Sequence, residues 1–127
     1  MIEPGEISQI CADVFGVEFV RLFERTREID VIKPRYTAIC LIKENMAIKT
    51  TVAIAAHFNL KQHSTVLNAM VQASNLFETD REFRQKYSEC ALKVRELYEE
   101  RVQELRAKDE VEAGIDDDNF IPFIYYD

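Results

Sequence analysis

The segment from Arg81 to about Glu112 places the strongest constraint on the fold, because it contains neither glycine nor proline. It predicts one uninterrupted helix, which at ~1.5 Å per residue is about 50 Å long and exceeds the width of the rest of a small domain. Apolar residues follow a spacing of alternately four and three positions along it, at Phe83, Tyr87, Cys90, Val94 and Leu97. This spacing gives the helix an apolar face. Asp80, directly before the segment, is a suitable N-cap.

Glycine and proline are scarce in the whole chain, with 3 of each among 127 residues. Sandwiches and barrels of β-strands need many more of both residues in their turns, so the chain is predicted to be all-α. We expect a compact helical bundle over residues 1–79, the long helix over residues 80–113 and an acidic and aromatic tail over residues 114–127. A chain of this length can bury a core without disulfides or a metal ion.

The first part of the chain divides into short helices at recognisable start and stop signals. The first helix is expected to end at Gly16, and a second, over residues 17–23, leads into a polar loop over residues 24–30. Because proline suits the first position of a helix, Pro34 is predicted to begin the next helix, which extends to about Asn45.

Two helices joined by a tight turn follow. Thr50 is a good N-cap for a short helix that stops near Phe58, and Asn59 tolerates the left-handed conformation in which helices commonly end. The second helix begins at Gln62 or His63 and extends to about Leu76. Its apolar residues, expected to face the core, are Val66, Leu67, Met70 and Val71. The pair is predicted to form a helix-turn-helix.

The formal net charge is −7, which by itself disfavours binding to a polyanion. The charge is unevenly distributed. Residues 1–76 carry 8 basic and 8 acidic side chains, whereas residues 77–127 carry 8 basic and 15 acidic ones. The acidity therefore lies wholly in the second part of the chain.

The residue pattern lacks the spacings typical of enzymes and metal sites. Cys11, Cys40 and Cys90 are far apart, and no nucleophile, base and orienting group recur with a recognisable spacing. We therefore expect no catalysis, no cofactor and no bound metal. The first residues do not resemble a signal peptide, and no stretch approaches the ~20 apolar residues of a membrane span, so we expect a cytoplasmic protein without membrane contact.

Hydrogen-bonding side chains gather around the predicted helix-turn-helix. In this motif the second helix lies in the major groove of DNA, and its N-terminal side chains contact base edges and phosphates. The start of that helix carries Lys61, Gln62, His63, Ser64, Thr65 and Asn68. Basic side chains precede the motif at Arg25, Arg27, Lys33 and Arg35. We therefore predict binding to double-stranded DNA.

The same order of motifs occurs in a known family. In Lys33-Pro34-Arg35, in residues 50–58 and in the run His63-Ser64-Thr65-Val66-Leu67-Asn68-Ala69, the chain resembles the C-terminal DNA-binding domain of the bacterial chromosomal replication initiator DnaA. The resemblance extends from Ile7 to about Tyr87. Gln62 replaces the aspartate usual in the family, and Asn59-Leu60 replaces a glycine pair, with Leu60 expected to point into the core.

The resemblance implies a role for each matching residue. Arg25, Arg27, Lys33 and Arg35 would face the DNA backbone and an adjacent minor groove, and Lys61, His63, Ser64 and Thr65 would contact the major groove and its phosphates. The initiator also carries an ATPase with a glycine-containing phosphate loop, for which this chain has no counterpart. We therefore expect sequence-specific DNA binding linked to replication initiation or its regulation, without ATPase activity.

Two further interpretations concern partners. The neutral first part of the chain also fits a protein adaptor that keeps the fold but not DNA binding, and acts through the long helix and the tail. The apolar residues of the long helix that lie beyond the bundle predict a homodimer through this helix. The acidic cluster Asp116-Asp117-Asp118 is expected to dock on a basic surface, such as the DNA-binding loop, or on a protein partner.

Overall fold

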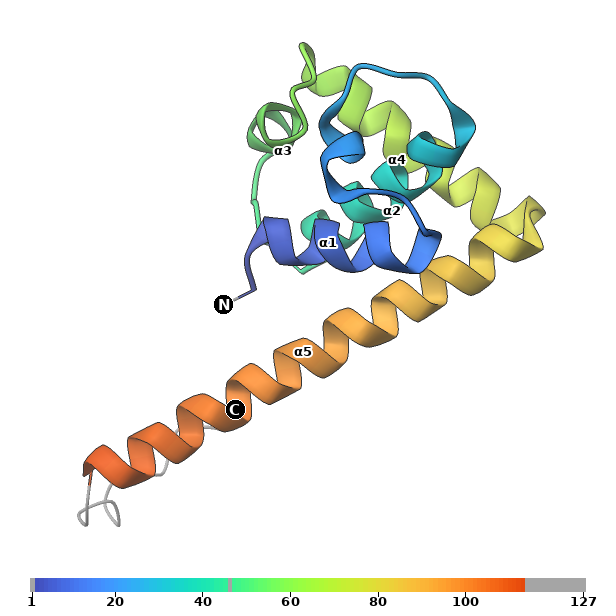
Figure 1. The fold of residues 1–127 in the computed structure, drawn as a ribbon. Coiled ribbons are helices and arrows are strands. Elements are labelled where there is room, and N and C mark those ends of the chain that lie inside the picture. The colour runs from blue at the N-terminus through green and yellow to red at the C-terminus, as the bar shows by residue number, and fades with distance from the viewer. Residues whose placement is uncertain (1, 46, 114–127) are drawn as a thin grey trace.

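The computed structural model describes residues 2–45 and 47–113 of the chain. Its elements are α1 (Pro4–Phe15), the 3-10 helix η1 (Phe19–Phe23), α2 (Ile29–Glu44), α3 (Thr51–His57), α4 (His63–Thr79) and α5 (Arg81–Ala113). Figure 1 shows the first five elements gathered into a bundle, with α5 running beneath it and projecting past α1. No strand occurs in this part of the chain, so the all-α prediction is confirmed. The predicted tail, residues 114–127, lies outside the described residues.

The predicted signals at three helix ends are confirmed. Gly16 follows α1 with a φ of 76°, and Asn59 follows α3 with a φ of 59°, so both adopt the left-handed conformation. The side chain of Thr50 accepts a hydrogen bond from the backbone N–H of Ala53 at 3.1 Å and caps α3. Each of these features depends on a backbone preference or on a partner within four residues, which is why local sequence predicts them.

The prediction that Pro34 begins a helix is wrong. α2 begins five residues earlier, at Ile29, and Pro34 lies inside it. The first turn is closed by the carbonyl of Glu28, which accepts hydrogen bonds from the N–H groups of Val31 and Ile32. Proline inside a helix costs one backbone hydrogen bond, and here Val31 and Pro34 are both buried, which offsets that cost.

The prediction for the apolar face of α4 is only partly right. Val66 is buried as expected, but Leu67 and Val71 are exposed, and the buried face continues through Ala69 and Ala73. α4 therefore packs into the bundle through a face that is rotated from the one marked by its larger residues.

The long helix α5 closes the bundle from below. Phe83, Cys90 and Val94 are buried, so the predicted apolar face is confirmed over this part of the helix. The contact with the bundle extends to Arg101, whose guanidinium forms an ion pair with Glu6 of α1. Farther along, Leu105 is exposed, and a homodimer through this face stays a prediction. None of the helices described here has the length and hydropathy needed to cross a membrane.

Candidate nucleic-acid interface

The turn between α3 and α4 gives the helix-turn-helix its geometry. Phe58 is buried at the end of α3, and the left-handed Asn59 reverses the chain. The N–H of Leu60 donates to the carbonyl of Ala55 at 2.8 Å, and the Leu60 side chain packs against the core as expected. The start of α4 is therefore held at a defined angle to α3.

The six candidate residues around the start of α4 are all exposed: Lys61, Gln62, His63, Ser64, Thr65 and Asn68. The carbonyl of Gln62 accepts from the N–H of Thr65 at 3.1 Å, and the Gln62 side chain lies 3.3 Å from the Ser64 hydroxyl. Gln62 thus begins the helix although its side chain makes no capping bond to the backbone. The remaining polar groups face solvent and can contact base edges and phosphates.

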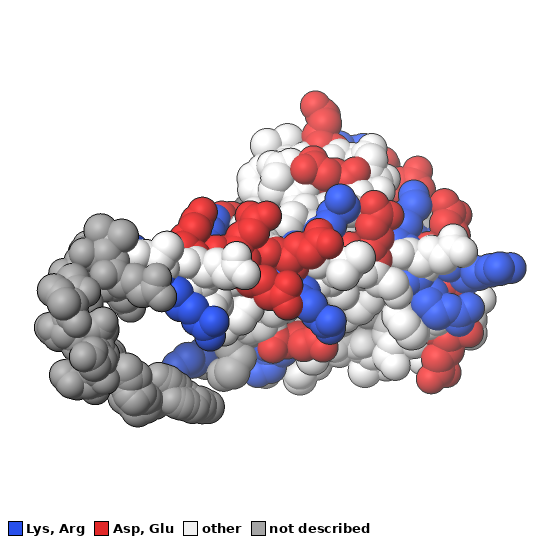
Figure 2. Space-filling model, turned by 90° about the horizontal axis from the view of Figure 1, so that it is seen from below, with Lys and Arg blue, Asp and Glu red and all other residues white. Residues whose placement is uncertain are grey.

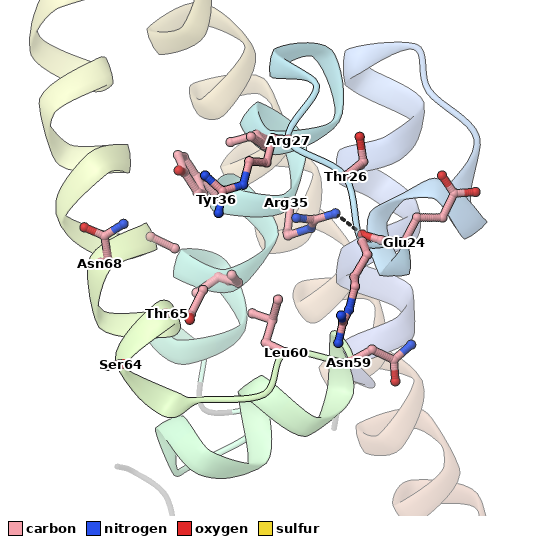
Figure 3. A pocket seen from close by; sticks show the side chains of 14 residues that line it. Glu24, Thr26, Arg27, Arg35, Tyr36, Asn59, Leu60, Ser64, Thr65 and Asn68 are labelled. Carbon is pink, nitrogen blue, oxygen red and sulfur yellow. Dashed lines mark hydrogen bonds between the residues drawn. The ribbon is translucent and has the colours of Figure 1, made fainter.

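Arg35 has a different environment from the one that its motif suggested. Its side chain is 7% exposed, and it donates from Nε to the carbonyl of Leu22 at 2.9 Å and from Nη2 to the carbonyl of Glu24 at 2.6 Å (Figure 3). Burial lowers the pKa of Arg35. Arg35 therefore fixes the loop between η1 and α2, residues 24–28, against α2.

The acidic residues of this loop are engaged by a residue that sequence reasoning missed. Arg21 forms ion pairs with Glu28 at 3.0 Å and Glu24 at 3.4 Å. Glu24 and Glu28 lie three and seven residues after Arg21, and this spacing was the only signal in the sequence. The contact with Glu28 forms only because the loop folds back toward Arg21. By contrast, Arg25 and Arg27 are exposed and form no ion pair with any described residue.

A pocket of about 680 Å³ lies between this loop and the start of α4. Figure 3 shows Arg27 and Tyr36 on one side of it, and Ser64, Thr65 and Asn68 along α4 on another. Six of the candidate residues line this pocket: Arg25, Arg27, Arg35, Ser64, Thr65 and Asn68. Three others line a neighbouring pocket beside α3: Lys61, Gln62 and His63.

Lys33 is the one candidate residue that lies apart from this group. Its Nζ is 2.8 Å from a carboxylate oxygen of Asp80, between α4 and α5. It lines a separate pocket together with Phe15, Glu82 and Lys86. Its ion pair connects α2 to the start of α5.

Acidic side chains are few on the helix-turn-helix. Within residues 51–79, Glu78 is the one acidic side chain, and it stands near the end of α4. Figure 2 views the molecule from below, with α5 across the near face, and shows acidic side chains there among lysines and arginines. In Figure 1, α3 and the start of α4 lie at the top of the bundle, away from α5.

Comparisons with known proteins identify the family. Residues 4–72 match the family model described as bacterial dnaA protein helix-turn-helix. The chain is 36% identical over 81 residues (64% of its length) to the chromosomal replication initiator protein DnaA of Bdellovibrio bacteriovorus, and it spans 17% of that protein. It is 34% identical over 80 residues (63% of its length) to DnaA of Thermus thermophilus, spanning 18% of that protein.

A third relative is DnaA of Oenococcus oeni, which is 26% identical over 96 residues, or 76% of this chain and 21% of that protein. The chain thus spans about a fifth of the length of these relatives. The family model covers more than half of the chain and includes α3, the turn and the start of α4. The chain therefore belongs to the bacterial DnaA helix-turn-helix family.

Proposed function

We propose that this chain binds double-stranded DNA sequence-specifically through α3 and α4, in replication initiation or its regulation, and that residues 1–127 do so without ATPase activity. The observation that carries the proposal is the shared pocket between the loop of residues 24–28 and the start of α4, which joins Arg25 and Arg27 to Ser64, Thr65 and Asn68. Family membership and the names of the DnaA relatives support the link to replication initiation.

The space between α4 and the loop of residues 24–28 could hold the backbone of one strand of duplex DNA. With α4 in the major groove, the sugar-phosphate backbone beside that groove would pass between α4 and the loop. Arg25 and Arg27 would then face the sugar-phosphate backbone and the adjacent minor groove, while Ser64 and Thr65 donate to phosphates. The pairing of Glu24 and Glu28 with Arg21 lowers the repulsion that these carboxylates would exert on DNA.

A protein adaptor is the second candidate. The exposed apolar residues of α5, Leu92, Tyr98 and Leu105, favour it, because surface leucines and tyrosines commonly serve protein contacts. Such an adaptor would not need the exposed arginines of the loop.

Selection from a random pool of duplexes, followed by titration of the selected duplex over a series of salt concentrations, distinguishes the two candidates. We expect an enriched motif and an affinity that falls with salt. Arg27→Ala should weaken binding to all sequences and lower the salt slope by about one unit for the lost phosphate contact. Lys33→Ala is the matched control, because Lys33 pairs with Asp80, and it should leave the slope unchanged.

An absence of any enriched motif would contradict sequence-specific binding. Equal salt slopes for the wild type and Arg27→Ala would exclude a phosphate contact by the loop.

A further inference from the structure

A pocket of about 330 Å³ lies where the end of α4 meets α2 and the start of α5. Met70, Ala73 and Phe77 line it from α4, Cys40 lines it from α2, and Tyr87 lines it from α5. None of the candidate residues for DNA contact lines this pocket. The proposed DNA binding therefore does not use it.

The inner wall of the pocket is uncharged and mostly apolar. The Cys40 thiol and the Tyr87 hydroxyl interact with each other. Burial, and next the charge of Glu44, raise the pKa of Cys40 to about 11, so the thiol is neutral at neutral pH. The ring of Phe77 meets that of Tyr87 edge to face, with centroids 5.4 Å apart, and Phe77 is still 37% exposed. Such a wall favours an apolar side chain that covers it and keeps water away.

Two carboxylates stand at the rim of the pocket. Glu78 lines the pocket directly, and Glu44 lies one turn after Cys40 on α2. Both side chains are exposed, and neither forms an ion pair with any residue in the described part of the chain. These rim carboxylates complement a basic residue next to the apolar side chain in the pocket.

The same charge disfavours an occupant from this chain. Its own aromatic segment, residues 120–126, is preceded by Asp116-Asp117-Asp118 and followed by Asp127. Residues 96–104 of α5, which a second copy could offer and which include the exposed Tyr98, carry 4 acidic residues and 1 basic residue. Both segments would bring carboxylates to a rim that is already negative, and like charges repel. A basic segment of another protein carries the opposite charge.

We propose that the pocket formed by Cys40, Met70, Phe77 and Tyr87 binds a short segment of a partner protein that carries one large apolar side chain next to lysine or arginine. The apolar side chain fills the pocket, and the basic residue lies against the rim carboxylates. One side chain buries far less than the roughly 1,000 Å² of a stable interface, so the contact is that of a short and weakly bound motif.

This contact is compatible with DNA binding and independent of it. Phe77 follows Ser64 by 13 residues, which places the pocket about 20 Å along α4 from the start of the helix. The partner segment and DNA can therefore occupy α4 together. Selection of duplexes tests the proposed function, and the experiment below contains no DNA, so either proposal can fail without the other.

Titration of the isotope-labelled full chain with tripeptides, followed by NMR chemical shifts, tests the proposal. The probe is acetyl-Lys-Phe-Lys-amide, and we expect saturable shifts of the backbone amides of Cys40, Phe77 and Tyr87. Acetyl-Lys-Ala-Lys-amide lacks the ring that fills the pocket and should bind about tenfold more weakly. Acetyl-Glu-Phe-Glu-amide keeps the ring, reverses the charge and should bind about fivefold more weakly at low salt.

Three variants locate the contact. Glu78→Gln removes one rim charge and should weaken binding of the Lys-Phe-Lys probe about twofold, and this difference should shrink as salt is added. Glu89→Gln is the matched control, because Glu89 is an exposed carboxylate of α5 that does not line the pocket. Ser74 is exposed on the pocket wall, so Ser74→Leu should block the pocket and abolish the shifts. Circular dichroism of Ser74→Leu should match that of the wild type.

Two results would overturn the proposal. If the Lys-Phe-Lys and Lys-Ala-Lys probes bind alike, or if neither shifts these amides, the pocket does not receive an apolar side chain. If the Glu-Phe-Glu probe binds as tightly as the Lys-Phe-Lys probe, the basic partner is excluded, and the acidic aromatic segment of residues 120–126 becomes the better occupant.

Discussion

Arg35 shows how a basic residue of a DNA-binding motif can act within the protein. Its guanidinium donates to two main-chain carbonyls, those of Leu22 and Glu24, and is almost completely buried. Hydrogen bonds from a charged group are about twice as strong as those between neutral groups. Arg35 therefore supports the loop from inside, while Arg25 and Arg27 present their charges outside.

Replacement of Arg35 should therefore affect stability first. We expect Arg35→Ala to lower the free energy of unfolding by about 2 kcal/mol, because two carbonyls lose a charged donor. Arg27→Ala, which removes an exposed arginine from the same pocket, should change it by less than about 0.5 kcal/mol. Urea denaturation of both variants measures the difference. Equal stabilities would show that Arg35 does not anchor the loop.

At the scale of elements, Asp80 joins three helices. It stands between α4 and α5, and one carboxylate oxygen accepts from the N–H of Phe83 at 3.1 Å, as predicted for an N-cap. The other oxygen pairs with Lys33 of α2 at 2.8 Å. The hydrogen bond from Lys33, and next the one from Phe83, lower the pKa of Asp80. The contact with Lys33 is tertiary, whereas the cap is local.

This lowered pKa predicts a pH dependence of stability. A carboxyl whose pKa is lower in the folded than in the unfolded chain stabilises the fold above its unfolded pKa of about 3.9, and that stability is lost as pH falls through the folded pKa. We expect Asp80→Asn, which keeps a capping oxygen, to melt at a lower temperature than the wild type at pH 7. The difference should vanish in acid below the folded pKa. A difference that is independent of pH would contradict the ionic contribution.

At the scale of the whole molecule, the far end of α5 lies away from the DNA-binding loop. About 48 Å of helix separates Arg81 from Ala113, and the pairing of Lys33 with Asp80 keeps the start of α2 near the Arg81 end. Figure 1 shows the far end of α5 on the opposite side of the molecule from the loop that precedes α2. The acidic cluster of residues 116–118 follows Ala113 by three to five residues and lies outside the described residues.

Docking of this cluster on a basic surface, such as the DNA-binding loop, therefore stays a prediction. If the cluster competes with DNA, truncation after Gly114 should make DNA binding tighter, more salt-sensitive and less selective. The full chain at the same concentration is the control. Unchanged DNA binding by the truncated chain would exclude this competition.

The sequence predictions are accurate where the interacting residues are close together in the chain, and they fail where the partners are far apart in it. The helix ends at Gly16, Thr50 and Asn59 were predictable because each depends on backbone preference or on a partner within a few residues. The start of α2 was missed because the first turn before Pro34 is stabilised by burial of Val31 against the rest of the bundle. The local preference of proline for the first position of a helix takes no account of this burial.

The sequence by itself determined the all-α class, the helix-turn-helix and the long α5, since these depend on periodicity, capping and turn residues that are adjacent in the chain. Only the tertiary structure decided which of the candidate side chains face solvent. Arg35 is buried and Lys33 is paired because the carbonyls of Leu22 and Glu24 and the carboxylate of Asp80 come to them from distant positions. Leu67 is exposed because the face of α4 that packs into the bundle carries Val66, Ala69 and Ala73 instead. Such partners are set by how the helices pack, which no local pattern contains.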